Sequence, residues 1–381
     1  MLADTADQDG YDPEMLERFA TDLVAAMGAS ADHAAQVAES LVGADLAGHN
    51  SHGIRRIPSY AQFARGERED IFTIDTDAEP AVVREGPAYA QVDGGFAFGQ
   101  VVGRLATAVL MEKVEETGIA VVGIRDATHL GRIGEWTGEV AEAGYLATAF
   151  VNGQGGALVA PAGSAQRRYG TNPHSYGIPT ADVLPFPIVL DIATSQVAHG
   201  KMGEFAATGA PLPSEWTVTE DGGSLSDGAA FEEGQGAILP LGGRTAGYKG
   251  FGLAMVAELL ASVVGDGLAV SQSDYIRGNA ACFVAIDPAL FTSREALADR
   301  VESLAEFIRT TEYSEHVSPG DAAYGDRAML PGEPEYLTAK SRRERGVPIP
   351  DADVEALCEV ADEHGIPGAI PDAFATVRDG A

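Results

Sequence analysis

The sequence is poor in basic residues, and above all in lysine. Its 381 residues contain 25 Lys and Arg against 57 Asp and Glu, which gives a formal net charge of -32. Nucleic-acid binders and proteins of anionic membranes build their affinity from clustered Lys and Arg, so this charge argues against both classes. The only lysines are Lys113, Lys201, Lys249 and Lys340.

An acid-rich, lysine-poor composition is typical of a protein that must stay hydrated in very high salt. Self-repulsion is screened there, since the Debye length falls to about 3 Å at 1 M salt. We therefore expect a chain from the cytoplasm of a halophile, with a generally acidic mesophile as the alternative. Disorder is not expected, because 45% of the residues are hydrophobic and the mean hydropathy is -0.02.

Cysteine and long apolar runs are scarce as well. Cys282 and Cys358 form neither a CxxC pair nor a disulfide framework, which indicates a reducing cytoplasm. The acidic start of the chain has no basic segment followed by an apolar run, so a signal peptide is not expected. The most apolar stretch, 251–264, contains Glu258 and is too short to span a bilayer. We expect a core helix there and no membrane association.

Two common nucleotide-binding motifs are also missing. No GxGxxG stands between a predicted strand and helix, and the phosphate-binding pattern GxxxxGK does not occur. An ordinary Rossmann or P-loop domain is therefore not expected. Glycine itself is abundant, at 46 residues, so that a single glycine cluster is weak evidence of a ligand site.

Hydrophobic periodicity predicts helices at both ends of the chain and alternating strands and helices between them. Asp12 before Pro13 predicts one helix start, and Ser30 predicts the N-cap of the next helix. The predicted helices are 14–27, 31–47, 99–116, 135–143, 293–310, 335–345 and 351–364, with a further one after Gly250. The predicted strands are 72–76, 81–84, 89–92, 119–124, 146–151, 187–190 and 282–286.

This pattern predicts an α/β protein with a helical domain built from both chain termini. The predicted helical domain is 1–70 plus 293–381, and the predicted α/β domain, which would bind cofactor and substrate, is 71–292. The alternative is a single domain in which the terminal helices cover the faces of the sheet.

The densest polar cluster of the sequence lies at 48–60. If Ser51 caps a helix that continues to Arg65, then His52, Arg56 and Tyr60 fall on one face, within an arc of about 80°. Arginine suits a two-pronged bond to a carboxylate, while histidine and tyrosine donate hydrogen bonds or move protons.

This cluster also has less specific interpretations. Pro58 would kink such a helix, and a solvated helix face with a stray histidine has the same spacing. His49 and His52 also suggest a metal, but no third ligand stands at a recognisable spacing, so we expect no metal.

A second candidate, His129, lies in the loop 126–134 that follows the apolar strand 119–124. Open α/β folds bind ligands beyond the carboxyl ends of their strands. A histidine near neutral pKa is the commonest general acid or base, and the alternative is a histidine bonded within a turn.

Several small-residue segments are suited to contact a phosphate or a sugar through the backbone, namely 152–156, 170–173 and 191–195. Lys201 and Lys249 are half of the four lysines, and both stand in glycine-flanked segments. Because a compact ammonium can enter a tight pocket, this placement favours ligand contact over solvation.

In their order along the chain, these motifs resemble the type 2 malate/L-lactate dehydrogenase family, from about residue 12 to beyond Gly332. The motifs are His49-Asn-Ser-His-Gly53 through Arg56 and Tyr60, Thr128-His-Leu-Gly131, Gly170-Thr-Asn-Pro173, Asp191-Ile-Ala-Thr-Ser195, Gly200-Lys201 and Tyr248-Lys-Gly-Phe-Gly-Leu253. The resemblance implies an NAD(P)-dependent oxidoreductase, usually a homodimer, whose nicotinamide-binding fold differs from Rossmann's.

The resemblance also implies a role for each site residue. His129 would exchange a proton with the substrate oxygen while hydride passes between the nicotinamide of NAD or NADP and C2 of a small 2-hydroxy or 2-oxo acid. His52 would assist catalysis, Arg56 would anchor the substrate carboxylate, and Tyr60 and Thr171 would also contact substrate. The expected cofactor contacts are Gly153, Asp191, Ile192, Ala193, Lys249, Pro331, Gly332 and Glu333.

Three positions depart from the family pattern. Asn50 stands where Asp is usual and Asp126 where Asn is usual, an exchange of charge that would retune the pKa of His52 or His129. Gly153 replaces a hydroxyl residue and leaves only backbone contact to the cofactor. Malate and L-lactate lead the expected substrates. The alternatives are a reductase of a cyclic imine carboxylate or keto sugar acid, a catalytically inactive binding homologue and, last, a metal-dependent hydrolase.

Overall fold

A seven-stranded sheet forms the centre of the computed structural model, which describes residues 10–312, 323–324 and 327–378. The strand order is β1-β2-β3-β9-β4-β5-β6, with β2 and β3 parallel and the other neighbours antiparallel. The predicted α/β class is confirmed, and this pairing is not that of a parallel Rossmann sheet. The strands are β1 (Ala81–Gly86), β2 (Tyr89–Asp93), β3 (Ile119–Ala127), β4 (Leu146–Gln154), β5 (His174–Ile178), β6 (Ile188–Ile192) and β9 (Gly278–Ile286).

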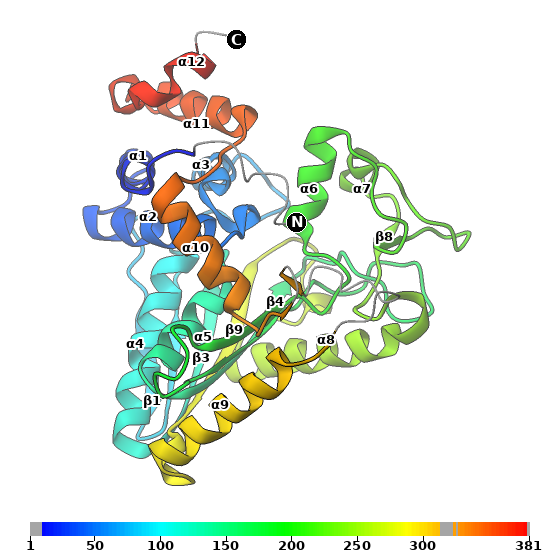
Figure 1. The fold of residues 1–381 in the computed structure, drawn as a ribbon. Helices are drawn as coiled ribbons and strands as arrows, with labels where there is room; N and C mark the ends of the chain where they lie inside the picture. The colour runs from blue at the N-terminus through cyan, green and yellow to red at the C-terminus, as the bar shows by residue number, and fades with distance from the viewer. Residues whose placement is uncertain (1–9, 313–322, 325–326, 379–381) are drawn as a thin grey trace.

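Helices cover both faces of the sheet (Figure 1). On one face α4 (Gly99–Thr117) packs on β2, β3 and β9, and α5 (Ile133–Glu142) packs on β4, β5 and β6. On the other, α8 (Gly243–Gly265) packs on β3, β4 and β9. The approach of α8 requires Gly123, since a Cβ there would overlap the carbonyl oxygen of Val264.

Only one side of α8 belongs to the core. Glu258 and Ala261 are buried against the sheet, while Leu259 is 53% and Val263 73% exposed. The helix has 23 residues, because it begins at Gly243 rather than after Gly250, and by length and composition alone it could cross a membrane. The expectation that this segment is too short for a bilayer is therefore wrong, although its packing on the sheet is that of a core helix.

Helices from the two ends of the chain share one hydrophobic core. Leu23 of α1, Leu41 of α2, Leu357 of α11 and Phe374 all lie in it. α11 packs on α3, and Figure 1 shows these terminal helices above the sheet. As predicted, Asp12 and Ser30 cap the first two helices. These terminal helices are α1 (Pro13–Ala26), α2 (Ala31–Leu46), α3 (Ile57–Ala64), α10 (Glu333–Arg345), α11 (Asp351–Glu363) and α12 (Ala375–Arg378).

One helix of the predicted terminal domain packs elsewhere. In α9 (Arg294–Arg309), Ala305 is buried with Leu184, Phe186 and Leu330, in a cluster separate from the terminal core. The division into 1–70 plus 293–381 and 71–292 stays a prediction.

The local structure differs from the sequence-based expectation at 72–76, at β5, which was not predicted, and after β6. Residues 72–76 form no strand, and the pairing there is a single bridge between Ile71 and Ile276. Short elements after β6 were not predicted, because they are too brief for a clear periodicity. These are α6 (His199–Thr208), β7 (Thr217–Val218), α7 (Gly228–Glu232) and β8 (Ala237–Ile238); later come β10 (Ala323–Tyr324), β11 (Arg327–Ala328) and the 3-10 turns Val270–Gln272, Pro288–Leu290, Pro367–Ala369 and Asp372–Phe374.

Candidate active site

The polar cluster 48–60 folds as two 3-10 turns and a short helix. The turns are Asn50–His52 and Ile54–Arg56, and α3 begins at Ile57. The continuous helix predicted from Ser51 is therefore wrong. Pro58 lies in the first turn of α3, where its missing N–H breaks no helical hydrogen bond.

The break between the turns is fixed by Asp45, a buried residue of α2. The N–H of Ile54 donates to Asp45 Oδ2 at 2.8 Å. A Cβ on Gly53 would overlap the same carboxylate, so only glycine fits there. Burial raises the pKa of Asp45 to about 7, because the charged form loses hydration. Asp45 thus holds the segment that carries His52 and Arg56.

His129 lies against two of the predicted site residues. Tyr60 Oη is 2.7 Å from His129 Nδ1, and Gln100 Nε2 donates to Tyr60 Oη at 2.8 Å. The imidazole rings of His52 and His129 stack, with centroids 5.4 Å apart and an interplanar angle of 22°. Two segments about 70 residues apart in sequence therefore meet in one polar group.

Arg56 borders this group. Its Nε donates to the backbone oxygen of Ser51 at 2.6 Å, and it forms no ion pair with a carboxylate of the described residues. Gly200 of α6 packs against it, because a Cβ on Gly200 would lie 2.8 Å from Arg56 Nη2. The start of α6 therefore forms one wall of the site.

The electrostatic environment keeps both imidazoles neutral near pH 7. Burial, followed by the charge of Arg56, lowers the pKa of His129 to about 3. Burial, followed by His129 and Arg56, lowers the pKa of His52 well below its usual value. Burial also raises the pKa of Tyr60 to about 12, so the phenol stays protonated. In the tautomer whose Nδ1–H donates to Tyr60 Oη, the Nε2 lone pair of His129 is available as a base.

The predicted residues of β6 and the preceding segment also lie together. Thr194 donates from N and Oγ1 to the backbone oxygen of Thr171, at 2.9 and 3.0 Å. Asp191 Oδ2 accepts from Gly134 N at 2.6 Å and so caps α5, the helix that follows the His129 loop. Burial raises the pKa of this carboxyl. Ile192 ends β6, and Ala193 connects it to Thr194.

Two further predicted cofactor residues leave groups free for a ligand. Gly153 pairs with Asn279 near the end of β4, and no atom lies within 4 Å of the position of a Cβ on it. Lys249 is exposed near the start of α8 and forms no hydrogen bond or ion pair within the described part of the chain.

The segment 331–333 packs against β6. Pro331 O accepts from Val189 N at 3.2 Å, and Gly332 adopts a positive φ of 88° as the N-cap of α10. Glu333 is 3% exposed; its carboxylate accepts from Leu330 N at 3.0 Å and from Arg309 Nη2 at 2.9 Å. This carboxylate is therefore used inside the protein.

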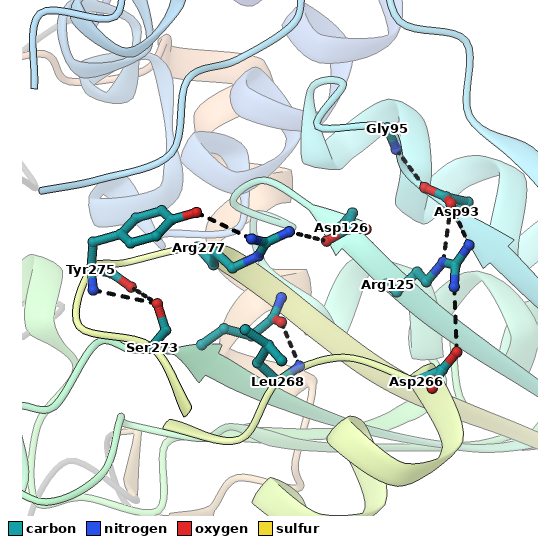
Figure 2. Close-up of polar contacts among 10 residues, drawn as sticks. Asp93, Gly95, Arg125, Asp126, Asp266, Leu268, Ser273, Tyr275 and Arg277 are labelled. Atoms are coloured by element: carbon teal, nitrogen blue, oxygen red, sulfur yellow. Dashed lines mark hydrogen bonds and ion pairs between the residues drawn. The ribbon is translucent and has the colours of Figure 1, made fainter. Parts of the chain in front are cut away.

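Two positions that depart from the family pattern bond to arginine side chains. Asn50 Oδ1 accepts from Arg342 Nη1 at 2.7 Å. Figure 2 shows Asp126 facing Arg277, at 3.5 Å, with Tyr275 Oη on the other side of this guanidinium. Neither Asn50 nor Asp126 is among the main causes of the shifted pKa of His52 or His129. The expected retuning by these two residues has no support in the structure.

Sequence analysis gave no role to Gln100 and Arg132. Gln100 is 1% exposed and donates a hydrogen bond to Tyr60. The only sign of this role in the sequence is a polar residue at the apolar start of a predicted helix. Arg132 stands three residues after His129 and is the N-cap residue of α5. A basic residue at a helix N-terminus is unfavourable for the helix dipole, which was the signal to notice.

Comparison with known proteins identifies the family. The family model described as malate/L-lactate dehydrogenase matches residues 11–358. The chain belongs to this family. Its members are hydroxyacid dehydrogenases, so the chain is an oxidoreductase by descent, and the resemblance of the motifs is confirmed.

Relatives of the malate/L-lactate dehydrogenase family match nearly end to end. Hydroxycarboxylate dehydrogenase B of Escherichia coli is 32% identical over 370 residues, 96% of this chain and 97% of the relative. The structure of malate dehydrogenase from Pyrococcus horikoshii matches with a TM-score of 0.80 and 29% identity over 94% of this chain and 96% of that one. The structure of Δ1-piperideine-2-carboxylate reductase from Pseudomonas syringae matches with a TM-score of 0.76 and 29% identity, over 93% and 100%.

Proposed function

We propose that this protein transfers a hydride between NAD or NADP and C2 of a small 2-hydroxy or 2-oxo acid of the malate or L-lactate type. The observation that carries this proposal is the 2.7 Å contact of Tyr60 with His129, next to an arginine, Arg56, without a carboxylate partner among the described residues. A 2-hydroxy acid has a carboxylate and a hydroxyl on neighbouring carbons. A guanidinium beside a neutral imidazole matches these two groups.

The roles follow from the protonation states. In oxidation, Arg56 holds the substrate carboxylate and His129 Nε2 accepts the hydroxyl proton, while Tyr60 Oη keeps Nδ1–H in place. In reduction, the imidazolium of His129 returns this proton to the developing alkoxide. NAD or NADP, when bound, supplies the hydride acceptor or donor. His52 stacks on His129 and limits its orientation.

The predicted cofactor residues suit NAD(P) in different ways. The exposed Lys249 offers an ammonium for the pyrophosphate. Near Gly153, the Oδ1 atom of Asn172 is buried without a hydrogen-bond partner, and a Cβ on Gly170 would lie 2.8 Å from it. Because Asp191 and Glu333 already accept protein N–H groups, we propose that the 191–193 and 331–333 segments contact the cofactor mainly through their backbone.

The test is the substitution His129→Gln, assayed by NADH and NADPH oxidation with oxaloacetate and pyruvate. We expect kcat with the preferred acid to fall about 100-fold or more, the scale of a lost general acid, while the Kd of the cofactor stays unchanged. His364→Gln, at the C-cap of α11 and remote from the site, is the matched control. Turnover by His129→Gln at the rate of the control would refute the mechanism.

A second candidate function shares the same site. A cyclic imine carboxylate also places a carboxylate next to the reduced carbon, and the likeness to Δ1-piperideine-2-carboxylate reductase favours this alternative. The same assay with this imine and with a keto sugar acid separates the two. Cofactor binding without turnover of any acceptor would instead indicate an inactive binding homologue.

We further propose a cytoplasmic homodimer with no nucleic-acid, membrane or metal partner. The net charge of -32 opposes nucleic acid and anionic lipid. The exposed apolar residues of α8 supply a surface for a second copy, because such a row is costly in water. These residues are Tyr248, Met255, Val256, Leu259 and Val263.

A further inference from the structure

The guanidinium of Arg132 has no hydrogen-bond partner in the part of the chain that the structure describes. Arg132 is partly buried, its Nε is buried without a hydrogen-bond partner, and the side chain forms no hydrogen bond or ion pair within the described residues. Its charge contributes to the lowered pKa of His52. Two arginines, Arg56 and Arg132, therefore act on His52, which stacks on His129.

Arg132 does not serve the helix that it begins. A cation at the N-terminus of α5 opposes the helix dipole. The N–H of Gly134 at this end is already bonded to Asp191. The charge of Arg132 favours the ionised forms of Asp191, Glu135 and Glu335, but its guanidinium donates no hydrogen bond within the described residues, so its donors are left for a ligand.

The acidic groups around Arg132 have other partners. A Cβ on Gly134 would lie 3.0 Å from both Arg132 Nη1 and Asp191 Oδ2, yet these two side chains form no ion pair. Glu135 accepts from Ser40 at 2.6 Å. In the same way Glu335 is 3.1 Å from His49 Nε2. Arg132 follows His129 by three residues on the same loop, and its guanidinium remains available to an anion.

We propose that Arg132 binds a second carboxylate, at the far end of a dicarboxylic 2-oxo or 2-hydroxy acid, while Arg56 binds the first. This inference rests on the proposed function and narrows its substrate class from malate or lactate to the dicarboxylic acids. A monocarboxylic acid such as pyruvate binds one guanidinium and leaves the other without a carboxylate partner. Specificity then arises from the number of charges on the substrate.

The experiment compares oxaloacetate with pyruvate in the wild-type protein and in Arg132→Leu. We expect wild type to favour oxaloacetate in kcat/KM by about 100-fold, the scale of a site whose buried charge is left unpaired by the wrong substrate. Arg132→Leu should lose about 100-fold with oxaloacetate and less than about 5-fold with pyruvate, and Arg132→Lys should fall between. Arg300→Leu, on the exposed surface of α9, is the control.

The outcomes separate this inference from the proposed function. Equal losses with both acids, or a Kd for NADH weakened more than the oxaloacetate kcat/KM, would overturn the role of Arg132. If Arg132→Leu does not fold, a wild-type preference for pyruvate alone overturns it. Absence of hydride transfer to every acid overturns the proposed function instead. In that case the Tm with malonate is compared with the Tm with acetate. A higher Tm with malonate that Arg132→Leu abolishes still supports binding of a second carboxylate by Arg132. Equal stabilisation by the two acids refutes it.

Discussion

His129 shows how neighbouring residues set the chemistry of a single side chain. Burial and the Arg56 guanidinium disfavour its charged form, whereas Tyr60 holds one ring nitrogen and so fixes which nitrogen faces substrate. The free protein therefore presents a neutral imidazole ready to accept a proton. The same shift makes the folded state lose stability as pH falls from about 6.5 toward 3, because the unfolded chain binds a proton that native His129 does not.

The lowered pKa of His129 predicts opposite pH profiles for the two directions. Oxidation uses the neutral ring, so its kcat/KM should be flat between pH 5 and 8. Reduction uses the imidazolium, whose population falls tenfold per unit above a pKa of about 3. We therefore expect kcat/KM for reduction to fall about tenfold per pH unit across this range. An inflection near 6.5 in both directions would show that His129 titrates normally.

At the residue scale, the sequence predicts the members of the site better than their contacts. His52, Arg56, Tyr60 and His129 were expected together from motif order, and they do meet. Arg132 had no expected role, because its lack of a hydrogen-bond partner among the described residues is visible only in three dimensions.

At the element scale, β4, α8 and the 170–173 segment meet at the buried Glu258. Its Oε1 accepts from Asn152 Nδ2 at 2.8 Å and from Val270 N at 2.7 Å, and its Oε2 accepts from Asn172 Nδ2 at 2.8 Å. All three partners are donors, so this position needs a carboxylate. Glu258, whose charge was taken as evidence against a membrane span, thus connects α8 to β4 through a hydrogen bond to Asn152.

The same network reaches the catalytic loop. Asn279 Nδ2 of β9 donates to Asn152 O at 2.9 Å, and Leu130 N donates to Asn279 Oδ1 at 3.2 Å. Leu130 follows His129 directly, and Asn152 precedes the predicted cofactor residue Gly153. Glu258 therefore aligns elements that carry catalytic and cofactor residues.

Glu258→Gln should disturb stability and catalysis together. The new amide places an N–H group against the Asn172 donor, and an unsatisfied buried polar group costs about 1–3 kcal/mol. We expect the free energy of unfolding in urea to fall by about this amount and kcat to fall about tenfold or more. Glu302→Gln, an exposed residue of α9, removes the same charge and should change neither. Wild-type values for Glu258→Gln would mean that the network does not align the site.

The elements that local rules govern were predicted to within a few residues. Caps at Asp12 and Ser30 set the first two helices, because their signals lie within one turn. The prediction of a continuous helix from Ser51 was wrong for a long-range reason. Asp45 of α2 accepts a hydrogen bond from the N–H of Ile54, and this bond interrupts the helix. The strand predicted at 72–76 was wrong for a similar reason, because an apolar run becomes a strand only where a partner strand is available.

For the whole molecule, surface charge and the apolar row of α8 act in opposite directions. Self-repulsion among 57 acidic residues opposes both folding and association, whereas burial of Leu259 and Val263 against a second copy favours association. High salt screens the repulsion and strengthens hydrophobic burial. The proposed homodimer should therefore be most stable in concentrated salt.

We propose on these grounds that the protein comes from a halophile, and salt dependence tests it. Raising KCl from about 0.1 M to about 3 M should raise the Tm by about 10 °C or more, because several kcal/mol of repulsion are screened at once. A variant with Glu295, Glu302 and Glu306 of α9 changed to Gln removes exposed charge and should need less salt for the same Tm. The effect should follow ionic strength. A Tm that is equal at the two KCl concentrations would instead fit an acidic mesophile, in which paired surface charges such as Arg125 with Asp93 and Asp266 already offset the repulsion at low salt.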